Sequence, residues 1–149
     1  MPERPFVHRL RVRYAECDMQ GHVFNGNYLT WFDVAHTELL RDAFGNYLDL
    51  VRDHGIDFVV AEANVRYRAP AHFDDELEIE VALQEPTTSS LTSRFTVRRD
   101  GETLTEGMLR HVCVEAQTMR KAPWPGAVRA AFGRYVVGAG PTRDSPSGA

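Results

Sequence analysis

Residues 27 to 44 restrict the fold of this chain more than any other segment, because they predict a helix with an unusually broad apolar face. Its apolar side chains recur at helical spacing and also flank that stripe on both sides: Tyr28, Leu29, Trp31, Phe32, Val34, Ala35, Leu39, Leu40 and Ala43. A helix with so wide an apolar face is expected to be buried on more than one side. Asn25 or Asn27 is expected to cap its start, and Gly45 its end.

The remaining apolar segments change to a period of two, which is typical of half-buried β-strands. Strands are predicted over residues 6–14, 58–68, 76–84, 91–98 and 103–117. The apolar side of the last strand is predicted to carry Leu104, Met108, Val112, Val114 and Ala116. Gly107 is a candidate bulge in it, and Asp100-Gly101 is a hairpin turn signal before it. Acidic side chains on one strand are expected to pair with arginines on the next.

The predicted order is one strand, the long helix, four strands in a meander, and a short helix that Pro125 opens and that ends near Val136. This order defines an α+β fold, in which one five-stranded antiparallel sheet has an apolar face that needs a cover. The long helix is the only predicted element large enough to provide that cover. The 149 residues fit one domain, assigned to residues 1–137. Residues 138–149 contain no large apolar side chain and predict a disordered tail.

Composition and charge exclude several functional classes. The net charge is −4, with 17 basic and 21 acidic residues well mixed, so no basic surface for nucleic acid is expected. No stretch approaches 18 apolar residues, which argues against a membrane span, and the start has no signal-peptide pattern. The two cysteines and six histidines show neither a disulfide framework nor metal-ligand spacing. We therefore expect a cytoplasmic protein that binds no metal.

The connection before the long helix, RYAECDMQGHVFNGNYLTWF (residues 13–32), carries an acid, a thiol and an imidazole close together. Taken alone, Asp18 is a typical turn residue, Cys17 is a small thiol suited to burial, and His22 is a turn histidine. A reactive thiol–imidazole pair of Cys17 with His22 is an alternative. Main-chain N–H groups at the helix start have no helical partners and lie at the positive end of the helix dipole.

Together with VRYRAPAHFDDELEI (residues 65–79) and HVCVEAQTMRKAPWP (residues 111–125), this connection resembles hotdog-fold acyl-CoA thioesterases. The resemblance is greatest to the 4-hydroxybenzoyl-CoA thioesterase family, including the bacterial acyl-CoA thioesterases linked to the Tol–Pal cluster, and covers roughly residues 6–136. It implies a sheet wrapped around one central helix and two subunits joined edge to edge into a continuous sheet. It also implies an active site at the dimer interface near the helix start, and dimers that often pair again into tetramers.

The resemblance assigns roles to several residues of the connection. It makes Asp18 the catalytic residue, either as a nucleophile that forms an acyl–enzyme anhydride or as a general base that activates water. The main-chain amides of Asn25 and Gly26 would form the oxyanion hole. Relatives carry Tyr or His at position 25, so any side-chain role of Asn25 is in doubt while its amide remains available. Tyr14 and His22 are expected to contact substrate.

Two basic residues after the last strand, Arg120 and Lys121, are expected to bind the phosphates of coenzyme A. Coenzyme A then arrives as part of the acyl-CoA substrate, and no separate cofactor is expected. The predicted reaction is hydrolysis of that thioester to a free acid and CoA. Two alternatives stay open: a hotdog enoyl-thioester hydratase or dehydratase, and a non-catalytic acyl-CoA-binding module.

Overall fold

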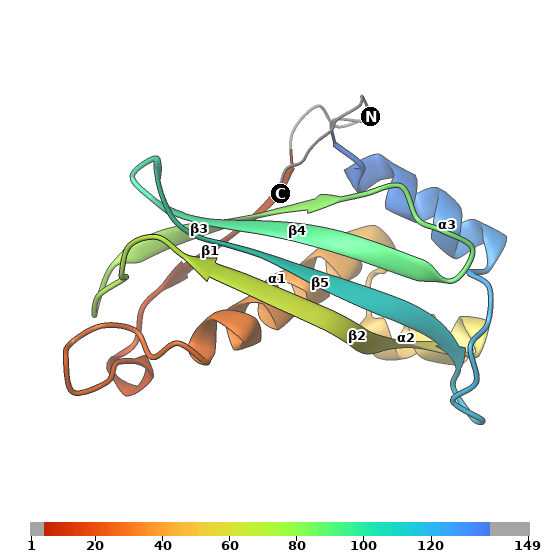
Figure 1. Cartoon of the computed structure of the whole chain (residues 1–149). Coiled ribbons are helices and arrows are strands. Elements are labelled where there is room, and N and C mark those ends of the chain that lie inside the picture. The colour runs from red at the N-terminus through yellow and green to blue at the C-terminus, as the bar shows by residue number, and fades with distance from the viewer. Residues whose placement is uncertain (1–4, 138–149) are drawn as a thin grey trace.

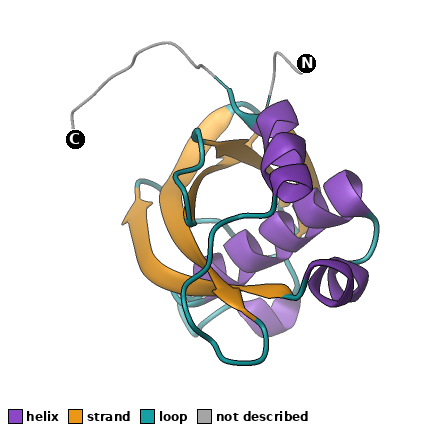
Figure 2. Cartoon of the chain, turned by 90° about the vertical axis from the view of Figure 1, so that its right-hand side faces the viewer, coloured by secondary structure: helices purple, strands orange, loops and turns teal. Residues whose placement is uncertain are grey.

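The computed structural model describes residues 5 to 137, so the tail predicted at 138–149 lies outside the described residues. The elements are, in order, β1 (Phe6–Arg11), η1 (Tyr14–Glu16), α1 (Asn27–Phe44), α2 (Tyr47–His54), β2 (Ile56–Tyr67), β3 (Glu76–Leu83), β4 (Ser90–Arg99), β5 (Glu102–Glu115), α3 (Gly126–Phe132) and η2 (Gly133–Tyr135). Figure 1 shows α1 lying along one face of the single five-stranded sheet. Figure 2 shows the strands curving around that helix. The predicted α+β hotdog architecture is therefore confirmed.

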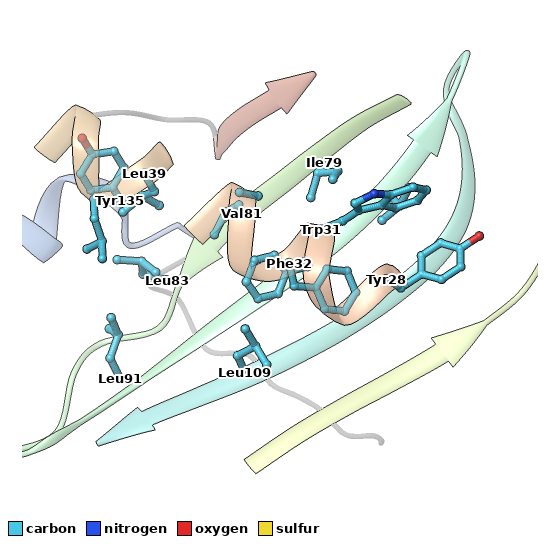
Figure 3. Close-up of a cluster of buried hydrophobic side chains, with 14 of the residues drawn as sticks. Tyr28, Trp31, Phe32, Leu39, Ile79, Val81, Leu83, Leu91, Leu109 and Tyr135 are labelled. Atoms are coloured by element: carbon cyan, nitrogen blue, oxygen red, sulfur yellow. The ribbon is translucent and has the colours of Figure 1, made fainter. Parts of the chain in front are cut away.

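Helix α1 has the predicted bounds, and its buried side chains form the centre of the core. Figure 3 shows side chains of α1 packed against the sheet, with Trp31 beside Ile79 and Phe32 over Leu109. The ring of Phe32 stacks on a ring of β4, that of Phe95, with 4.6 Å between their centroids. Each fully buried side chain of this size contributes about 1.5–3 kcal/mol to folding. Leu29 and Val34, expected in the same face, are each 40% exposed, so the buried face of α1 is narrower than predicted.

The ends of α1 differ in how well they were predicted. Gly45 is the C-cap, as expected, and its amide donates to the carbonyl oxygen of Arg41 at 2.8 Å. The prediction of a side-chain cap by Asn25 or Asn27 is wrong, because the N-cap is Gly26 and no side chain caps it. The side-chain Nδ2 of Asn27 instead donates to the carbonyl oxygen of Glu16, in the connection before the helix.

The order of strands corrects the predicted meander. β1 pairs with β3, so β2 lies at the opposite edge of the sheet and pairs with β5. Only β3, β4 and β5 form a meander. Periodicity identifies strands, but their neighbours depend on contacts between residues that are distant in sequence. The result is that one long edge of β2 faces outward from the sheet.

Along most of β5 the buried face is the opposite of the one predicted, although Leu104 and Val114 are buried as expected. The buried side chains on that face are Thr105, Leu109, His111 and Cys113, whereas Met108 and Val112 are only half-buried. The prediction failed because two of the buried side chains are polar and so do not look like core residues.

Gly107 is not a bulge. The irregularities in strand register fall between Val60 and Glu62 and between Val97 and Arg98. Gly107 instead lies against the ring of Phe32, where an added Cβ would come within 2.6 Å of the ring atom Cζ. The absence of a side chain at this position lets α1 approach the sheet closely.

Shorter features complete the fold. Opposite charges pair across neighbouring strands as predicted, for example Arg11 with Glu76 at 2.6 Å, although such exposed pairs contribute little stability. Helix α2 was not predicted; the side chain of Asn46 caps it. The helix expected after Pro125 is present as α3 followed by η2. Within residues 5–137, no helix is long and apolar enough to cross a membrane.

Candidate active site

The connection between η1 and α1 folds into a tight hairpin. The amide of Phe24 donates to the carbonyl oxygen of Glu16 at 2.9 Å, and the amide of Asp18 donates to that of His22 at 2.8 Å. Gly21 closes the turn with a φ of 83°, a left-handed conformation that glycine adopts readily. The hairpin therefore holds Asp18 directly beside the start of α1.

Asp18 is exposed, and one of its carboxylate oxygens accepts a hydrogen bond from the amide of Gln20 at 2.9 Å. This contact is an Asx-turn, the structural role that an aspartate in a loop commonly has. Among residues 5–137, no other donor bonds to the carboxylate. One face of the carboxylate therefore remains available for a second role.

The first turn of α1 offers free donors beside this carboxylate. The amide of Asn27 bonds to the carbonyl oxygen of Phe24 at 3.0 Å, and that of Tyr28 approaches the carbonyl oxygen of Asn25 at 3.4 Å. Within the described part of the chain, the amides of Asn25 and Gly26 have no hydrogen-bond acceptor. Both lie at the positive end of the dipole of an 18-residue helix, where an anionic oxygen is stabilised.

These groups line one pocket of about 300 Å³. Its walls are formed by the hairpin, the first turn of α1 and the end of β2: Asp18, Gln20, His22, Val23, Asn25, Tyr28, Tyr67, Arg68, Ala69 and Pro70. Three residues predicted from the sequence, Asp18, His22 and Asn25, therefore come together in one pocket. Gly26 follows Asn25 in the chain and is not itself a lining residue.

The pocket also contains two tyrosines that sequence reasoning missed. Tyr28 and Tyr67 meet edge to face, with 5.4 Å between their centroids, and the hydroxyl of Tyr67 donates to the main-chain carbonyl oxygen of Asn25. Burial raises the pKa of Tyr28, so its phenol stays neutral. Tyr28 was counted only as a core residue of the helix. For Tyr67, its place just before Ala69-Pro70 was the available signal.

His22 lies half-buried in the pocket wall, and its ring packs against the ring of a second histidine. Its ring meets that of His72 edge to face, with 5.1 Å between the centroids, and Nδ1 of His72 lies 3.8 Å from a carboxylate oxygen of Asp75. Cys17 is not activated as a nucleophile. Burial, followed by the charge of Asp18, raises the pKa of its thiol, which disfavours the thiolate that the alternative thiol–imidazole pair would need.

Tyr14 does not line the pocket. It was predicted to end the first strand, but β1 ends at Arg11 and Tyr14 begins the short helix η1. Its side chain is 81% exposed and packs edge to face against Phe73, at 5.9 Å between centroids. Its contact with substrate stays a prediction.

Arg120 and Lys121 lie far from the pocket within one chain. The carbonyl oxygen of Arg120 accepts from the amide of Glu115 at 2.8 Å, and Glu115 is paired with Ile56 at the start of β2. The pocket is at the other end of β2, beside Tyr67. At about 3.3 Å per residue, these ends are roughly 35 Å apart.

Metal ligands do not gather in this pocket. Across residues 5 to 137, no group of three or more histidine, cysteine, aspartate or glutamate side chains is arranged to hold a metal ion. The candidate site combines one carboxylate, Asp18, with Asn25 at the helix start in the same pocket.

The fold and this site define a hotdog protein of the thioesterase class, and comparison with known proteins agrees. The profile of the thioesterase-like superfamily matches residues 12–132. The acyl-CoA thioester hydrolase YbgC of Escherichia coli O6:H1 is 32% identical over 125 residues, which are 83% of this chain and 92% of that protein. The chain therefore belongs to the thioesterase-like superfamily, and the predicted enzyme class is confirmed.

Two solved structures extend the likeness to three dimensions. A hypothetical protein from Thermus thermophilus has a TM-score of 0.79 and 33% identity, covering 87% of this chain and 98% of its own. A gentisyl-coenzyme A thioesterase has a TM-score of 0.75 and 28% identity, covering 85% and 98%. Both likenesses therefore cover most of this chain and nearly all of the other.

Proposed function

We propose that this chain hydrolyses an acyl-CoA thioester to a free acid and CoA, with Asp18 as the reacting carboxylate and the amides of Asn25 and Gly26 as the oxyanion hole. One observation carries the proposal: Asp18 and Asn25 line the same pocket beside a helix start with free donors. The relatives named as acyl-CoA and gentisyl-coenzyme A thioesterases support this reaction. The acyl group stays open, because both short aliphatic and aromatic chains suit the proposal.

The free amides provide the stabilisation that the reaction needs. A thioester oxygen against Asn25 and Gly26 meets donors that are fixed before the reaction begins, at the positive end of α1. Negative charge grows on that oxygen as the carbonyl carbon is attacked, so these hydrogen bonds strengthen in the transition state. One such donor typically contributes about 10²- to 10³-fold in kcat.

Asp18 has two routes, and both stay open. As a nucleophile, its carboxylate oxygen bonds to the carbonyl carbon, the C–S bond breaks, CoA thiolate leaves, and water then opens the anhydride. As a general base, it takes a proton from a water whose oxygen attacks the same carbon, after which the C–S bond breaks and CoA thiolate leaves. Thiolate is a good leaving group, so neither route requires a strong general acid. The single bond from Gln20 leaves the carboxylate free for either route.

We also propose a homodimer joined through the outer edge of β2. On that edge the main-chain groups of Ile56–Tyr67 have no neighbouring strand within the described sheet, and a long unpaired edge readily adds another strand. The side chains of Val60 and Tyr67, both about half exposed, would be covered by the second copy. Further pairing of two dimers into a tetramer, and the cytoplasmic location, stay predictions.

Such a dimer would bring the predicted phosphate-binding residues to the pocket. When a two-fold axis perpendicular to a continuous sheet relates the two copies of β2, the strands run antiparallel, so the Ile56 end of one lies beside the Tyr67 end of the other. Arg120 and Lys121 of the second copy would then approach the pocket of the first. Their positive charges suit the phosphates of a CoA that extends out of the pocket.

Release of free thiol from a panel of aliphatic and aromatic acyl-CoAs tests this function. We expect Asp18→Asn to lower kcat by about 10²- to 10⁴-fold, while Asp53→Asn, which changes an exposed aspartate on α2, stays at the wild-type rate. The proposal fails if no thioester is cleaved, or if Asp18→Asn keeps a near-wild-type kcat. Consumption of an enoyl-CoA without thiol release would instead favour a hydratase.

A further inference from the structure

Glu16 is a buried carboxylate at the base of the Asp18 hairpin that the proposed chemistry does not use. Its side chain is 10% exposed. One carboxylate oxygen accepts from the amide of Arg13 at 2.8 Å. The other accepts from the guanidinium of Arg13 at 2.6 Å and from the indole Nε1 of Trp31 at 2.8 Å. A single side chain therefore joins η1 to the first turns of α1.

The main-chain carbonyl of Glu16 makes a second set of bonds to the helix start. It accepts from the amide of Phe24 at 2.9 Å and from the side-chain Nδ2 of Asn27 at 2.8 Å. These two donors flank Asn25 and Gly26 in sequence. Glu16 thus binds the residues on either side of the two free amides and leaves those amides unoccupied.

The charge of Glu16 is compatible with its buried position. Burial disfavours the ionised form, but the hydrogen bonds from Arg13 and Trp31 outweigh this effect, so the pKa of Glu16 is lowered overall. The group stays ionised at neutral pH. An ionised carboxylate forms stronger hydrogen bonds than a neutral acceptor does, which makes the connection to Trp31 rigid.

We propose that Glu16 is a positioning residue, which fixes the Asp18 hairpin relative to the free amides of Asn25 and Gly26. This inference rests on the proposed function, because it assumes that Asp18 and these amides act together. Asp18 follows Glu16 by two residues, and the amides lie between the two donors that the carbonyl of Glu16 binds. Loss of the bond to Trp31 would let the two halves of the site move apart.

The first test is the variant Glu16→Gln, which keeps the shape of the side chain. A glutamine has one acceptor oxygen, so its NH₂ group would meet a donor, either Trp31 Nε1 or an Arg13 group. We expect kcat for acyl-CoA hydrolysis to fall by about tenfold or more, with KM within about twofold of wild type, because substrate binding does not require the alignment. The matched control is Asp49→Asn on α2, which also removes the charge of a carboxylate paired with an arginine three residues away, Arg52 at 2.5 Å, but outside the pocket; it is expected to leave kcat within about twofold.

The second test combines Glu16→Gln with Asp18→Asn. If Glu16 acts by placing Asp18, its replacement should cost less than about threefold in kcat once the carboxylate at position 18 is gone. An equal loss in both backgrounds would overturn the inference. It would also be overturned if Glu16→Gln lowers the melting temperature but keeps the wild-type kcat at temperatures where it is folded.

A separate variant covers the case in which Glu16→Gln does not fold. Asn27→Ala removes one bond to the carbonyl of Glu16 and leaves the carboxylate and its partners intact. It should lower kcat while KM changes little, and the fall in kcat should be smaller when Asp18 is replaced by Asn. A wild-type kcat for Asn27→Ala would count against the inference. If Asp18→Asn itself is fully active, the proposed function fails. If Asp18→Asn is inactive while Glu16→Gln and Asn27→Ala are unaffected, only the positioning role fails.

Discussion

The hydroxyl of Tyr67 donates a hydrogen bond to the main-chain carbonyl oxygen of Asn25, at 3.1 Å. This contact joins the end of β2 to the turn that begins α1. The carbonyl belongs to the same peptide group as the amide of Gly26. Because a peptide group is planar, a bond that fixes the carbonyl also fixes the direction of one of the proposed oxyanion donors.

Tyr67→Phe should therefore lower activity without preventing folding. Loss of one neutral hydrogen bond costs about 0.5–1.5 kcal/mol, so we expect kcat to fall by about two- to tenfold. Tyr47→Phe is the matched control, since it also removes a hydroxyl that bonds to a neighbour, Asp57, but away from the pocket. Steady-state thiol-release kinetics would check both; equal effects would contradict the role given to Tyr67.

Asn25→Pro should remove one oxyanion donor while Asn25→Ala keeps it. Asn25 is the second residue of a turn closed by the bond from Asn27 to Phe24, and proline is favoured at this place in a type I turn. Since proline has no N–H, we expect a loss of about 10²- to 10³-fold in kcat. Asn25→Ala should lose less than Asp18→Asn does. A similar rate for both variants at position 25 would show that the amide is not used.

Gly107→Ala should destabilise the fold. Besides the ring of Phe32, the new methyl group would meet the carbonyl oxygen of Asn64 at 2.9 Å, and main-chain atoms cannot easily move away. Overpacking of this kind costs about 1–3 kcal/mol or more. Gly133→Ala is the control, because nothing lies near its added Cβ and its φ of −57° suits alanine. Urea denaturation of both variants measures the difference; an unchanged midpoint for Gly107→Ala would refute the close approach.

A pair of buried histidines predicts sensitivity to acid. The rings of His36 on α1 and His111 on β5 stack with 4.3 Å between centroids, and one nitrogen of each has no partner among the described residues. Burial, together with the neighbouring His111, holds the pKa of His36 well below its ordinary value of 6.5. Burial also lowers the pKa of His111, against an opposing effect of Asp33.

The free energy of unfolding should therefore fall as the pH drops below about 6.5. In that range the unfolded chain binds protons that the folded chain does not. Each such proton changes the slope of the unfolding free energy against pH by about 1.4 kcal/mol per pH unit. His36→Leu should reduce this slope, whereas His54→Gln, at an exposed histidine, should not. Chemical denaturation between pH 5 and 8 would measure both; the same slope in His36→Leu as in wild type would contradict the prediction.

The fold was predictable where the pattern is local. The broad apolar face of residues 27 to 44 and the alternating segments identify the helix and every strand of the sheet. The place of β2 was not predictable, because its pairing with β5 joins residues that are distant in sequence, such as Ile56 and Glu115, 59 positions apart. The face of β5 was misjudged because its buried side includes Thr105 and His111.

The candidate site divides in the same way. Asp18, His22 and Asn25 meet because one short hairpin holds them, and the resemblance of that segment to thioesterases named them in advance. Tyr67 was missed because it reaches the pocket from a strand 42 residues further along the chain. Tyr14 was misplaced because the bonds between Arg13 and Glu16 turn the chain into η1 where alternation predicted more strand.

The close approach at Gly107 has a consequence for engineering the acyl-group preference. Phe32 occupies the space above Gly107, and it follows Tyr28 by one helical turn, so the height of α1 over β5 also sets where Tyr28 meets Tyr67 in the pocket wall. Combining Gly107→Ala with the smaller Phe32→Leu would change that height while relieving the overlap. The width of the pocket could then be altered through these two residues, without substituting any residue that lines it.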